Sequence, residues 1–273
     1  MHQTPSKLKE SLQNNSFNFK KKYGQNFIID QNIINNIINK AKIDNETLVI
    51  EIGPGAGALT TKLGPIAKNV LAYEIDETLK PILESTITSN TKIIYKDFLK
   101  AHIKEDLKNY EYKKLYVIAN LPYYITTPII KKIIEEQIPT DKIIVMVQKE
   151  VGNRFCAKPN TKEYNSLSIY LNYYFNIKKI LEVSRNVFLP KPNVDSVVVL
   201  FTKKETKLKV KNENIFFKLV KDSFIQKRKI LKNNLKHYDL NKIEEVLKKH
   251  NYTLQTRAES LPIEVFVEIA NNL

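Results

Sequence analysis

Short apolar runs recur along the first part of the chain, and segments with helical periodicity separate them. An apolar run of about five residues between turn residues is typical of a buried strand. The first helical segment follows Asp30, a good N-cap residue, and places Ile33, Ile34, Ile37 and Ile38 on one face. Alternating strands and helices predict an α/β domain with a mostly parallel sheet covered on both faces. We expect strands at residues 48–52, 70–73, 92–95, 115–119 and 143–147, and helices at 77–87 and 128–137.

The pattern changes in the last hundred residues and predicts a second domain. Two β-rich runs, near 177–183 and 194–201, are expected to close the sheet as an antiparallel hairpin. Residues 203–212 are charged and poor in apolar side chains, which is typical of a linker. Helical patterns follow at roughly 214–235, 241–249 and 262–271. We therefore divide the chain into a polar, flexible tail at 1–20, a Rossmann-like domain at 21–203 and a small all-helical domain at 204–273.

The charge of the chain indicates a polyanionic partner. Its 273 residues include 44 Lys and Arg against 29 Asp and Glu, which gives a net charge of +15. Nucleic acid is the commonest partner of such a surface, and an anionic membrane surface is the second candidate. A surface that is merely rich in lysine is the third interpretation. Residues 203–273, with 16 basic and 9 acidic side chains, are the most basic part per residue.

Several functional classes are excluded by what the sequence lacks. The single cysteine, Cys156, excludes a disulfide framework, and the four histidines have no metal-binding spacing, so we expect no metal. No apolar run reaches the roughly 18 residues of a membrane span, and charged residues interrupt any N-terminal signal sequence. We therefore expect a cytoplasmic protein without a membrane partner, and a monomer.

A glycine-rich loop follows the first predicted strand. Three of the six glycines in the chain, Gly53, Gly55 and Gly57, fall within five residues. Glycine at this place lets a ligand approach the backbone closely. Glu74 ends the next strand, where a carboxylate is suited to accept both ribose hydroxyls of an adenosine. Asp97, two residues after the third strand, is suited to bind the adenine amino group, although a surface aspartate before a loop is an equally common interpretation.

The loop alone leaves three interpretations open. It fits a dinucleotide such as NAD(P), a tight turn without a ligand, or S-adenosylmethionine. It is not a P-loop, because no Gly-Lys-Ser/Thr follows. We favour S-adenosylmethionine because of the motif at the end of the fourth strand.

That motif is Asn120-Leu121-Pro122-Tyr123. It resembles the signature of enzymes that methylate exocyclic amines of nucleobases. The amine of adenine is a poor nucleophile, because its lone pair is delocalised into the ring. The Asn120 side-chain oxygen and the Leu121 carbonyl are suited to accept its two N–H bonds, and Pro122 stiffens the turn. Tyr123 offers a flat face for a base removed from its stack. A strand-terminating turn without a catalytic role is the alternative.

A later segment suggests a second contact with the base. Phe188 precedes the rigid loop Pro190-Lys191-Pro192. Its ring is a candidate for the opposite side of a clamp around the base, although a core phenylalanine is an equally common interpretation of such a residue.

Taken together, these motifs resemble one family. Residues 22–28 (Lys-Tyr-Gly-Gln-Asn-Phe-Ile), 51–55, 120–123, 188–192, 226–235 and 257–261 occur in the order typical of the KsgA-type rRNA adenine dimethyltransferases. The resemblance runs from about residue 20 to 273. It implies a methyltransferase that places two methyl groups from S-adenosylmethionine on each of two adjacent adenines. These adenines lie in a hairpin loop near the 3′ end of 16S-type rRNA, in the pre-30S-type particle of ribosome assembly.

The resemblance also implies site residues. Its cofactor contacts correspond to Asn26, Ile28, Gly53, Glu74, Asp97 and Asn120. The sequence departs from the family's usual residues at Tyr23, Ile28 and 124–126, which affects positioning near the site rather than the groups that accept the amine. In the helical domain, Lys227, Arg228, Lys229 and Lys232 span less than two helical turns and are expected to contact rRNA phosphates. A solvated basic face is the alternative for this cluster.

Two other functions are compatible with these motifs. An Erm-type methyltransferase, which modifies large-subunit rRNA, shares the glycine loop and the Asn-x-Pro-Tyr core. A non-catalytic RNA-binding assembly or transcription factor on the same fold is the second, although Asn120 and Glu74 are intact.

Overall fold

The computed structural model describes residues 17, 19–20, 23–122, 125–206 and 208–273, which form two compact units. The first unit takes in the described residues up to Gly152 together with Lys178–Thr202, and the second contains Asn153–Ile177 and Lys203–Leu273. The later of the two divisions falls between Thr202 and Lys203. Residues 153–177, which the sequence pattern had placed in the first domain, pack with the second unit, because Ala157, Tyr164, Ile169 and Tyr173 belong to its hydrophobic core.

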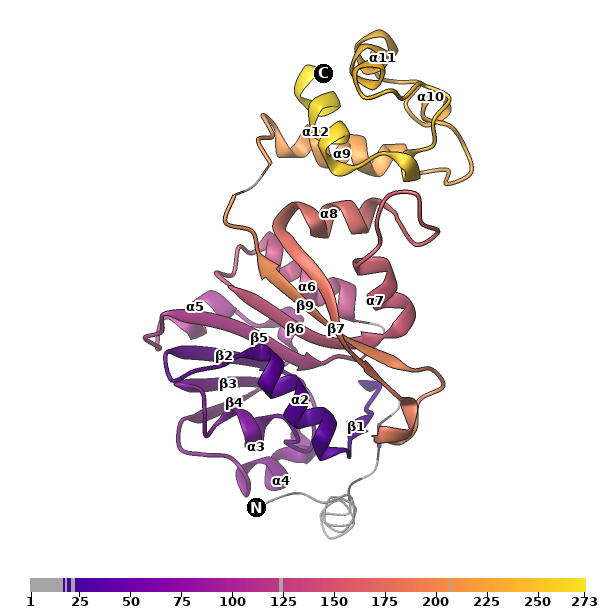
Figure 1. Ribbon diagram of the computed structural model, residues 1–273. Helices are drawn as coiled ribbons and strands as arrows, with labels where there is room; N and C mark the ends of the chain where they lie inside the picture. The colour runs from indigo at the N-terminus through magenta and orange to yellow at the C-terminus, as the bar shows by residue number, and fades with distance from the viewer. Residues whose placement is uncertain (1–16, 18, 21–22, 123–124, 207) are drawn as a thin grey trace. The chain divides into compact units, whose positions relative to one another are not determined.

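The first unit is built on a seven-stranded sheet with the order β4-β3-β2-β5-β6-β9-β7 (Figure 1). β2, β3, β4, β5 and β6 run parallel to one another, and β9 is antiparallel to β6. The mostly parallel Rossmann-like sheet that the sequence predicts is thus confirmed. The strands are β2 (Thr47–Ile52), β3 (Asn69–Glu74), β4 (Thr91–Tyr95), β5 (Lys114–Asn120), β6 (Lys142–Gln148), β7 (Phe175–Val183) and β9 (Ser196–Lys203).

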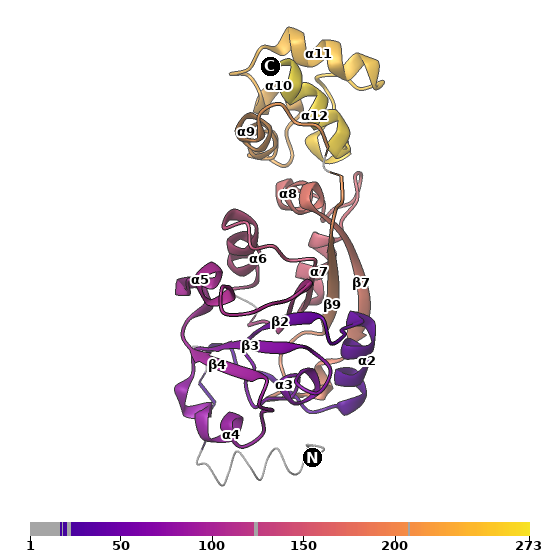
Figure 2. The ribbon, with the colours of Figure 1, turned by 90° about the vertical axis from the view of Figure 1, so that its left-hand side faces the viewer.

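Helices cover both faces of this sheet. The α2 helix (Gln31–Ala41) begins at Asp30, whose side chain accepts hydrogen bonds from the backbone N–H groups of Asn32 and Ile33, as predicted. Ile34 and Ile37 of α2 share a core with Leu63 of α3 (Thr60–Leu63) and with apolar side chains of the strands. α5 (Ile103–Leu107) and α6 (Thr126–Glu135) lie on the other side of the sheet from α2 (Figure 2).

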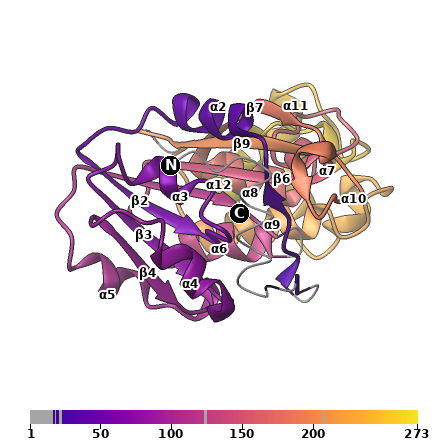
Figure 3. The ribbon, with the colours of Figure 1, turned by 90° about the horizontal axis from the view of Figure 1, so that it is seen from below.

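The order of the strands determines where a ligand binds. The chain runs outward from β2 to β3 and β4 and then returns to β5 on the other side of β2. In an open parallel sheet such a reversal leaves a crevice at the carboxyl ends of the two central strands. Ile52 and Asn120 end the neighbouring parallel strands β2 and β5, so the glycine loop and the Asn120 motif lie at the same end of the sheet. Figure 3 shows β2, β3 and β4 side by side from below.

A short two-stranded sheet lies beside the main one. β1 (Phe27–Ile28) pairs antiparallel with β8 (Phe188–Leu189), so that Ile28 is opposite Phe188. This pair was not predicted from the sequence, because two-residue strands carry no periodicity. The remaining local elements of the first unit are α4 (Lys80–Glu84), α7 (Lys149–Phe155, which continues into the second unit) and the short helices η2 (Glu77–Leu79), η3 (Phe98–Lys100) and η4 (Arg185–Val187).

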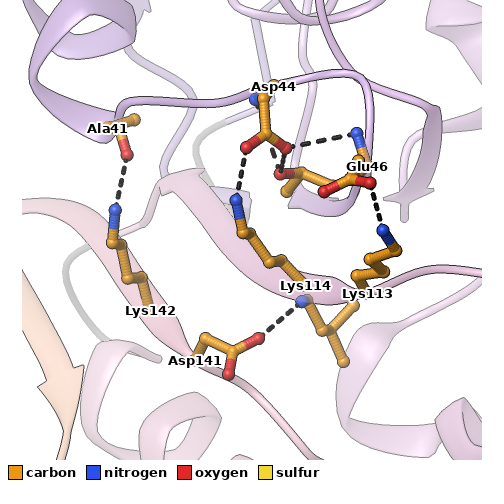
Figure 4. A network of polar contacts seen from close by, with 9 residues as sticks. Ala41, Asp44, Glu46, Lys113, Lys114, Asp141 and Lys142 are labelled. Atoms are coloured by element: carbon orange, nitrogen blue, oxygen red, sulfur yellow. Dashed lines mark hydrogen bonds and ion pairs between the residues drawn. The ribbon is translucent and has the colours of Figure 1, made fainter.

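Ion pairs and hydrogen bonds join residues at the amino ends of β2, β5 and β6 (Figure 4). Lys114 at the start of β5 pairs with Asp44, and Lys113 pairs with Glu46. Asp44 also accepts a hydrogen bond from the Thr47 hydroxyl at 2.6 Å. The hydrogen bond from Lys114 is the main cause that lowers the pKa of Asp44 to about 2.

The second unit is helical. Phe216, Leu247 and Phe266 are fully buried in its core. The predicted helix over 214–235 is wrong in its second half: α9 ends at Ser223, and residues 224–230 form a loop. The Asn234 side chain donates to the Ser223 carbonyl at 2.7 Å and so satisfies a backbone acceptor at the end of α9. The helices are α8 (Ser166–Tyr174), α9 (Glu213–Ser223), α10 (Leu231–Asn234), α11 (Leu240–Lys249), η5 (Ala258–Ser260) and α12 (Ile263–Asn272).

Candidate active site

The glycine loop turns sharply after β2. Gly53 and Gly55 have φ angles of +67° and +59°, which side chains with a Cβ atom rarely adopt. A Cβ atom at Gly53 would meet no atom within 4 Å, whereas one at Gly55 would lie 2.9 Å from Cε1 of Phe27. The loop is therefore open toward the crevice at Gly53 and closely packed against the N-terminal segment at Gly55.

Glu74 is fixed at the end of β3 by two backbone hydrogen bonds. Its Oε2 accepts the Gly55 N–H at 3.0 Å and its Oε1 accepts the Asp76 N–H at 2.8 Å. Burial raises the pKa of Glu74 above its ordinary value, although both backbone hydrogen bonds act in the opposite direction. Each oxygen retains a second lone pair, so the carboxyl is held rigidly and is still suited to accept a hydroxyl on each side.

A second buried carboxyl, Glu51 of β2, lines the same pocket. It is only 1% exposed, and its Oε2 has no hydrogen-bond partner among the described residues. Burial raises the pKa of Glu51 to about 8. An unpaired buried acceptor is costly unless a ligand supplies a donor. The amino group of S-adenosylmethionine is such a donor, so this side of the pocket fits the cofactor.

Residues 23–28 form the wall of the pocket that faces the glycine loop. Asn26 is held in place by its own side chain, which donates to the Gly24 carbonyl at 3.1 Å. The backbone carbonyl of Asn26 accepts a hydrogen bond of 2.8 Å from Nδ2 of Asn120. Since Nδ2 is the donating end of the amide, this bond directs Oδ1 of Asn120 to the other side.

The end of β5 is anchored to the neighbouring strand. The Leu121 N–H donates to the Met146 carbonyl at 3.2 Å, and Leu121 is 2% exposed. Pro122 follows, and its carbonyl accepts the Ile125 N–H at 3.2 Å. Hydrogen bonds at Leu121 and Pro122 therefore hold the backbone that directly follows Asn120.

These groups enclose a pocket of about 190 Å³. Nine residues that the sequence predicts for the site line it: Asn26, Ile28, Gly53, Gly55, Glu74, Asp97, Asn120, Leu121 and Pro122. Asp97 also caps η3 through a 2.9 Å hydrogen bond from the Leu99 N–H. Tyr123 lies outside the described residues.

Phe188 does not line this pocket. Its ring is 4% exposed and belongs to a core cluster with Ile28, Val183 and residues of α2. A base could stack on this ring only if the ring left the core. The structure thus agrees with the interpretation of Phe188 as a core residue, and the predicted clamp has no support in its placement.

Some pocket residues were not predicted from the sequence. Glu51 belongs to one of the motifs but was given no role, although an acidic residue inside an apolar strand is a signal in itself. Ile75, which lines the pocket and is 45% exposed, was also missed. Gln25 belongs to the motif at residues 22–28, but the sequence gives it no role, because its hydrogen-bond partner Asp76 lies 51 residues further along the chain.

The basic cluster Lys227, Arg228, Lys229 and Lys232 lies in the second unit, and all four residues are exposed. The first three occupy the loop after α9 rather than a helix, and Lys232 lies in α10. The amino group of Lys227 donates to the Lys162 carbonyl within the same unit. The cluster is therefore presented on an ordered loop.

Known proteins resemble this chain over nearly its whole length. A family model described as ribosomal RNA adenine dimethylase matches residues 16–273. Two curated relatives named ribosomal RNA small subunit methyltransferase A are each 47% identical. The match to the protein of Bacillus pumilus covers 99% of this chain and 96% of the relative, and the match to that of Staphylococcus aureus covers 97% and 93%.

Solved structures agree with the fold. A dimethyladenosine transferase from Plasmodium falciparum superposes with a TM-score of 0.73 at 27% identity, and the match covers 89% of this chain and 95% of that structure. The 23S rRNA methyltransferase ErmE superposes with a TM-score of 0.72 at 21% identity over 90% of this chain and 99% of its own, which at that identity shows the fold alone.

The described residues contain no helix long and apolar enough to cross a membrane, and no group of three or more potential metal ligands. The glycine loop, Glu74 and Asn120 share one pocket, and the sequence matches one family throughout. The chain belongs to the ribosomal RNA adenine dimethylase family and is a methyltransferase that uses S-adenosylmethionine.

Proposed function

We propose that this enzyme transfers two methyl groups to the N6 amine of each of two adjacent adenines in a hairpin loop near the 3′ end of small-subunit rRNA. The names of the 47% identical relatives support the small subunit as the target. The substrate in this proposal is a pre-30S-type particle in the cytoplasm, and the enzyme acts as a monomer during ribosome biogenesis.

The orientation of the Asn120 amide carries the proposal. Its Nδ2 is committed to the Asn26 carbonyl, so Oδ1 is the group available to accept an N–H of the adenine amine. The Leu121 carbonyl is the second acceptor. Two acceptors on the amine increase electron density on its nitrogen and fix its direction of attack. No side chain needs to remove a proton beforehand, so positioning supplies most of the rate acceleration.

The bound cofactor supplies a methyl group activated on a sulfonium ion. The residues that would hold it lie on three sides of the pocket. Glu74 would accept the ribose hydroxyls, Asp97 would bind the adenine amino group, and the loop at Gly53 and Gly55 would contact the methionine portion. The unpaired acceptor on Glu51 is suited to the amino group of that portion. Asn26 and Ile28 complete the pocket from the N-terminal segment.

In the second unit, we assign rRNA phosphate contacts to Lys227, Arg228, Lys229 and Lys232. Their exposure and their closeness in the chain support this role. Phosphate contacts of this kind position an enzyme on RNA without reading its sequence.

The proposal is tested in cells that lack the protein. Mass spectrometry of their small-subunit rRNA should show two adjacent unmodified adenines that are dimethylated in the parent strain. Expression of the wild-type chain should restore both modifications, and the Asn120→Ala variant should not. Unchanged small-subunit adenines, or a change in large-subunit rRNA instead, would contradict the proposal and favour an Erm-type activity.

A further inference from the structure

The Asp76 carboxylate lies just beyond the cofactor pocket and receives an unusual number of hydrogen bonds. It follows β3 by two residues and is 1% exposed. Lys20 Nζ donates to Oδ1 at 2.6 Å, and Gln25 Nε2 donates to Oδ2 at 2.7 Å. The Thr78 hydroxyl and N–H donate to Oδ1 at 2.7 and 3.2 Å. Burial opposes ionisation, but these hydrogen bonds outweigh it, and the pKa of Asp76 lies below its ordinary value.

Two of these donors come from the N-terminal segment, which is distant in sequence. Lys20 and Gln25 are also bound to each other, because the Lys20 N–H donates to Gln25 Oε1 at 2.9 Å. The Tyr23 N–H donates to the Lys20 carbonyl at 3.0 Å. The segment is therefore fastened to the Asp76 carboxylate, and Lys20 Nζ makes a further 3.2 Å hydrogen bond to the Thr78 hydroxyl, which itself donates to Asp76.

Residues 26 and 27, which directly follow Gln25, contact two parts of the active site. Next to Gln25, the carbonyl of Asn26 holds the Asn120 amide at 2.8 Å. The following residue, Phe27, packs against Gly55 of the glycine loop. A shift of this segment would thus change both the cofactor pocket and the direction of the Asn120 oxygen.

The other contacts of the N-terminal segment restrict its position less than the hydrogen bonds to Asp76 do. Phe17 and Phe19 lie 5.8 and 5.3 Å from the Phe27 ring, centroid to centroid, but such apolar contacts tolerate sliding. The β1–β8 pairing begins only at Phe27. The directional contacts that tie Lys20 and Gln25 to the residues after β3 are the bonds to Asp76, at 2.6 and 2.7 Å, and the longer bond from Lys20 to the Thr78 hydroxyl, at 3.2 Å.

We propose that Asp76 is a positioning residue that, through Lys20 and Gln25, fixes residues 23–28 as one wall of the cofactor pocket and thereby sets the direction of the Asn120 amide. The part that concerns Asn120 rests on the proposed function. The part that concerns the cofactor pocket does not, so the two can fail separately.

The chain offers a matched control at the opposite edge of the sheet. Asp44 accepts hydrogen bonds from a lysine, Lys114, from the Thr47 hydroxyl and from the Glu46 N–H, much as Asp76 does from Lys20 and Thr78. Asp44→Asn weakens a similar set of hydrogen bonds, one of them from a lysine, at a residue that does not line the pocket. Comparison of Asp76→Asn with Asp44→Asn separates positioning from general stability.

The test measures the affinity of the full chain for S-adenosylhomocysteine by calorimetry, together with KM for S-adenosylmethionine, kcat and Tm. Asp76→Asn should weaken S-adenosylhomocysteine binding about 10-fold or more, the effect of losing a hydrogen bond to a charged group. Asp44→Asn should leave this affinity within about 2-fold of wild type. Lys20→Met should resemble Asp76→Asn, and Lys20→Arg, which keeps the charge, should recover most of the affinity.

Hydrogen exchange supplies a readout that does not depend on catalysis. The Tyr23 amide should lose protection in Asp76→Asn and Lys20→Met, and keep it in Asp44→Asn. Wild-type affinity in Lys20→Met, or equal losses in Lys20→Met and Lys20→Arg, would overturn the proposal. These two lysine variants decide the matter even if Asp76→Asn fails to fold. The proposed function fails on a different result, an Asn120→Ala variant that keeps wild-type kcat.

Discussion

The side chain of Asn120 donates a 2.8 Å hydrogen bond to the backbone carbonyl of Asn26, 94 residues earlier in the chain. An amide that donates through Nδ2 has its oxygen fixed as well, because the two groups share one plane. The bond therefore converts a flexible side chain into an acceptor of defined direction at the end of β5. It also makes the amine-binding group dependent on the segment that closes the cofactor pocket.

Replacement of Asn120 should affect catalysis more than cofactor binding. Asn120→Ala removes the Oδ1 acceptor, and we expect kcat to fall by about 10²–10³, as when one preorganised hydrogen-bonding group of an active site is removed. The affinity for S-adenosylhomocysteine should change less. Single-turnover methyl transfer and calorimetry measure the two effects. An alanine variant with wild-type kcat would refute the assigned role.

The two glycines of the loop should differ in their response to alanine. Both have positive φ, but only a Cβ at Gly55 meets the Phe27 ring, at 2.9 Å. Gly55→Ala should therefore lower Tm and cofactor affinity more than Gly53→Ala. The double variant Gly55→Ala with Phe27→Leu should recover part of the loss, because leucine vacates the contact. Equal effects of the two single variants would contradict this packing.

Glu51 should make stability depend on pH. Its pKa rises from 4.5 to about 8 on burial, so the folded chain holds a proton in this interval that the unfolded chain releases. The stability that this group contributes is fully present below about pH 4.5 and is lost as the pH rises through about 8. Glu51→Gln mimics the protonated form and lacks this loss.

The measurement is Tm as a function of pH without cofactor. The Tm of Glu51→Gln relative to wild type should increase steadily from about pH 5 to pH 8. A difference that stays constant across this range would show that Glu51 does not carry a raised pKa.

The basic loop of the second unit should contribute to RNA binding through charge. Replacement of Lys227, Arg228, Lys229 and Lys232 by glutamine should weaken binding to small-subunit rRNA. It should also flatten the dependence of log K on log salt, by roughly 0.7–0.9 for each phosphate that the variant no longer neutralises. A control with the same charge change at Lys209, Lys211, Lys242 and Lys248 should alter the slope less. Equal slopes in both variants would identify the cluster as a solvated face.

Local patterns predicted the first unit well. Each expected strand is present within three residues of its predicted bounds, because buried strands of a parallel sheet appear as continuous apolar runs. The glycine loop was equally visible, since three of the six glycines follow one apolar run. The α9 helix was predicted too long, because its end depends on Asn234, 11 residues beyond Ser223.

What the sequence did not reveal depends on contacts between distant residues. Asp76 has the local appearance of an ordinary N-cap, and its bonds to Lys20 and Gln25 span 56 and 51 residues. Phe188 is a core residue because β8 pairs with β1, a two-residue contact without a periodic signal. These residues are distant in sequence and come into contact only when the chain folds, so no local pattern predicts their contacts.

The most direct test of the proposed activity incubates the enzyme with S-adenosylmethionine labelled in its methyl group and with purified small or large ribosomal subunits that lack the modification. Nucleoside mass spectrometry then locates the label. We predict N6,N6-dimethyladenosine at two adjacent positions near the 3′ end of small-subunit rRNA. Label on large-subunit rRNA, or on no RNA at all, would contradict this activity.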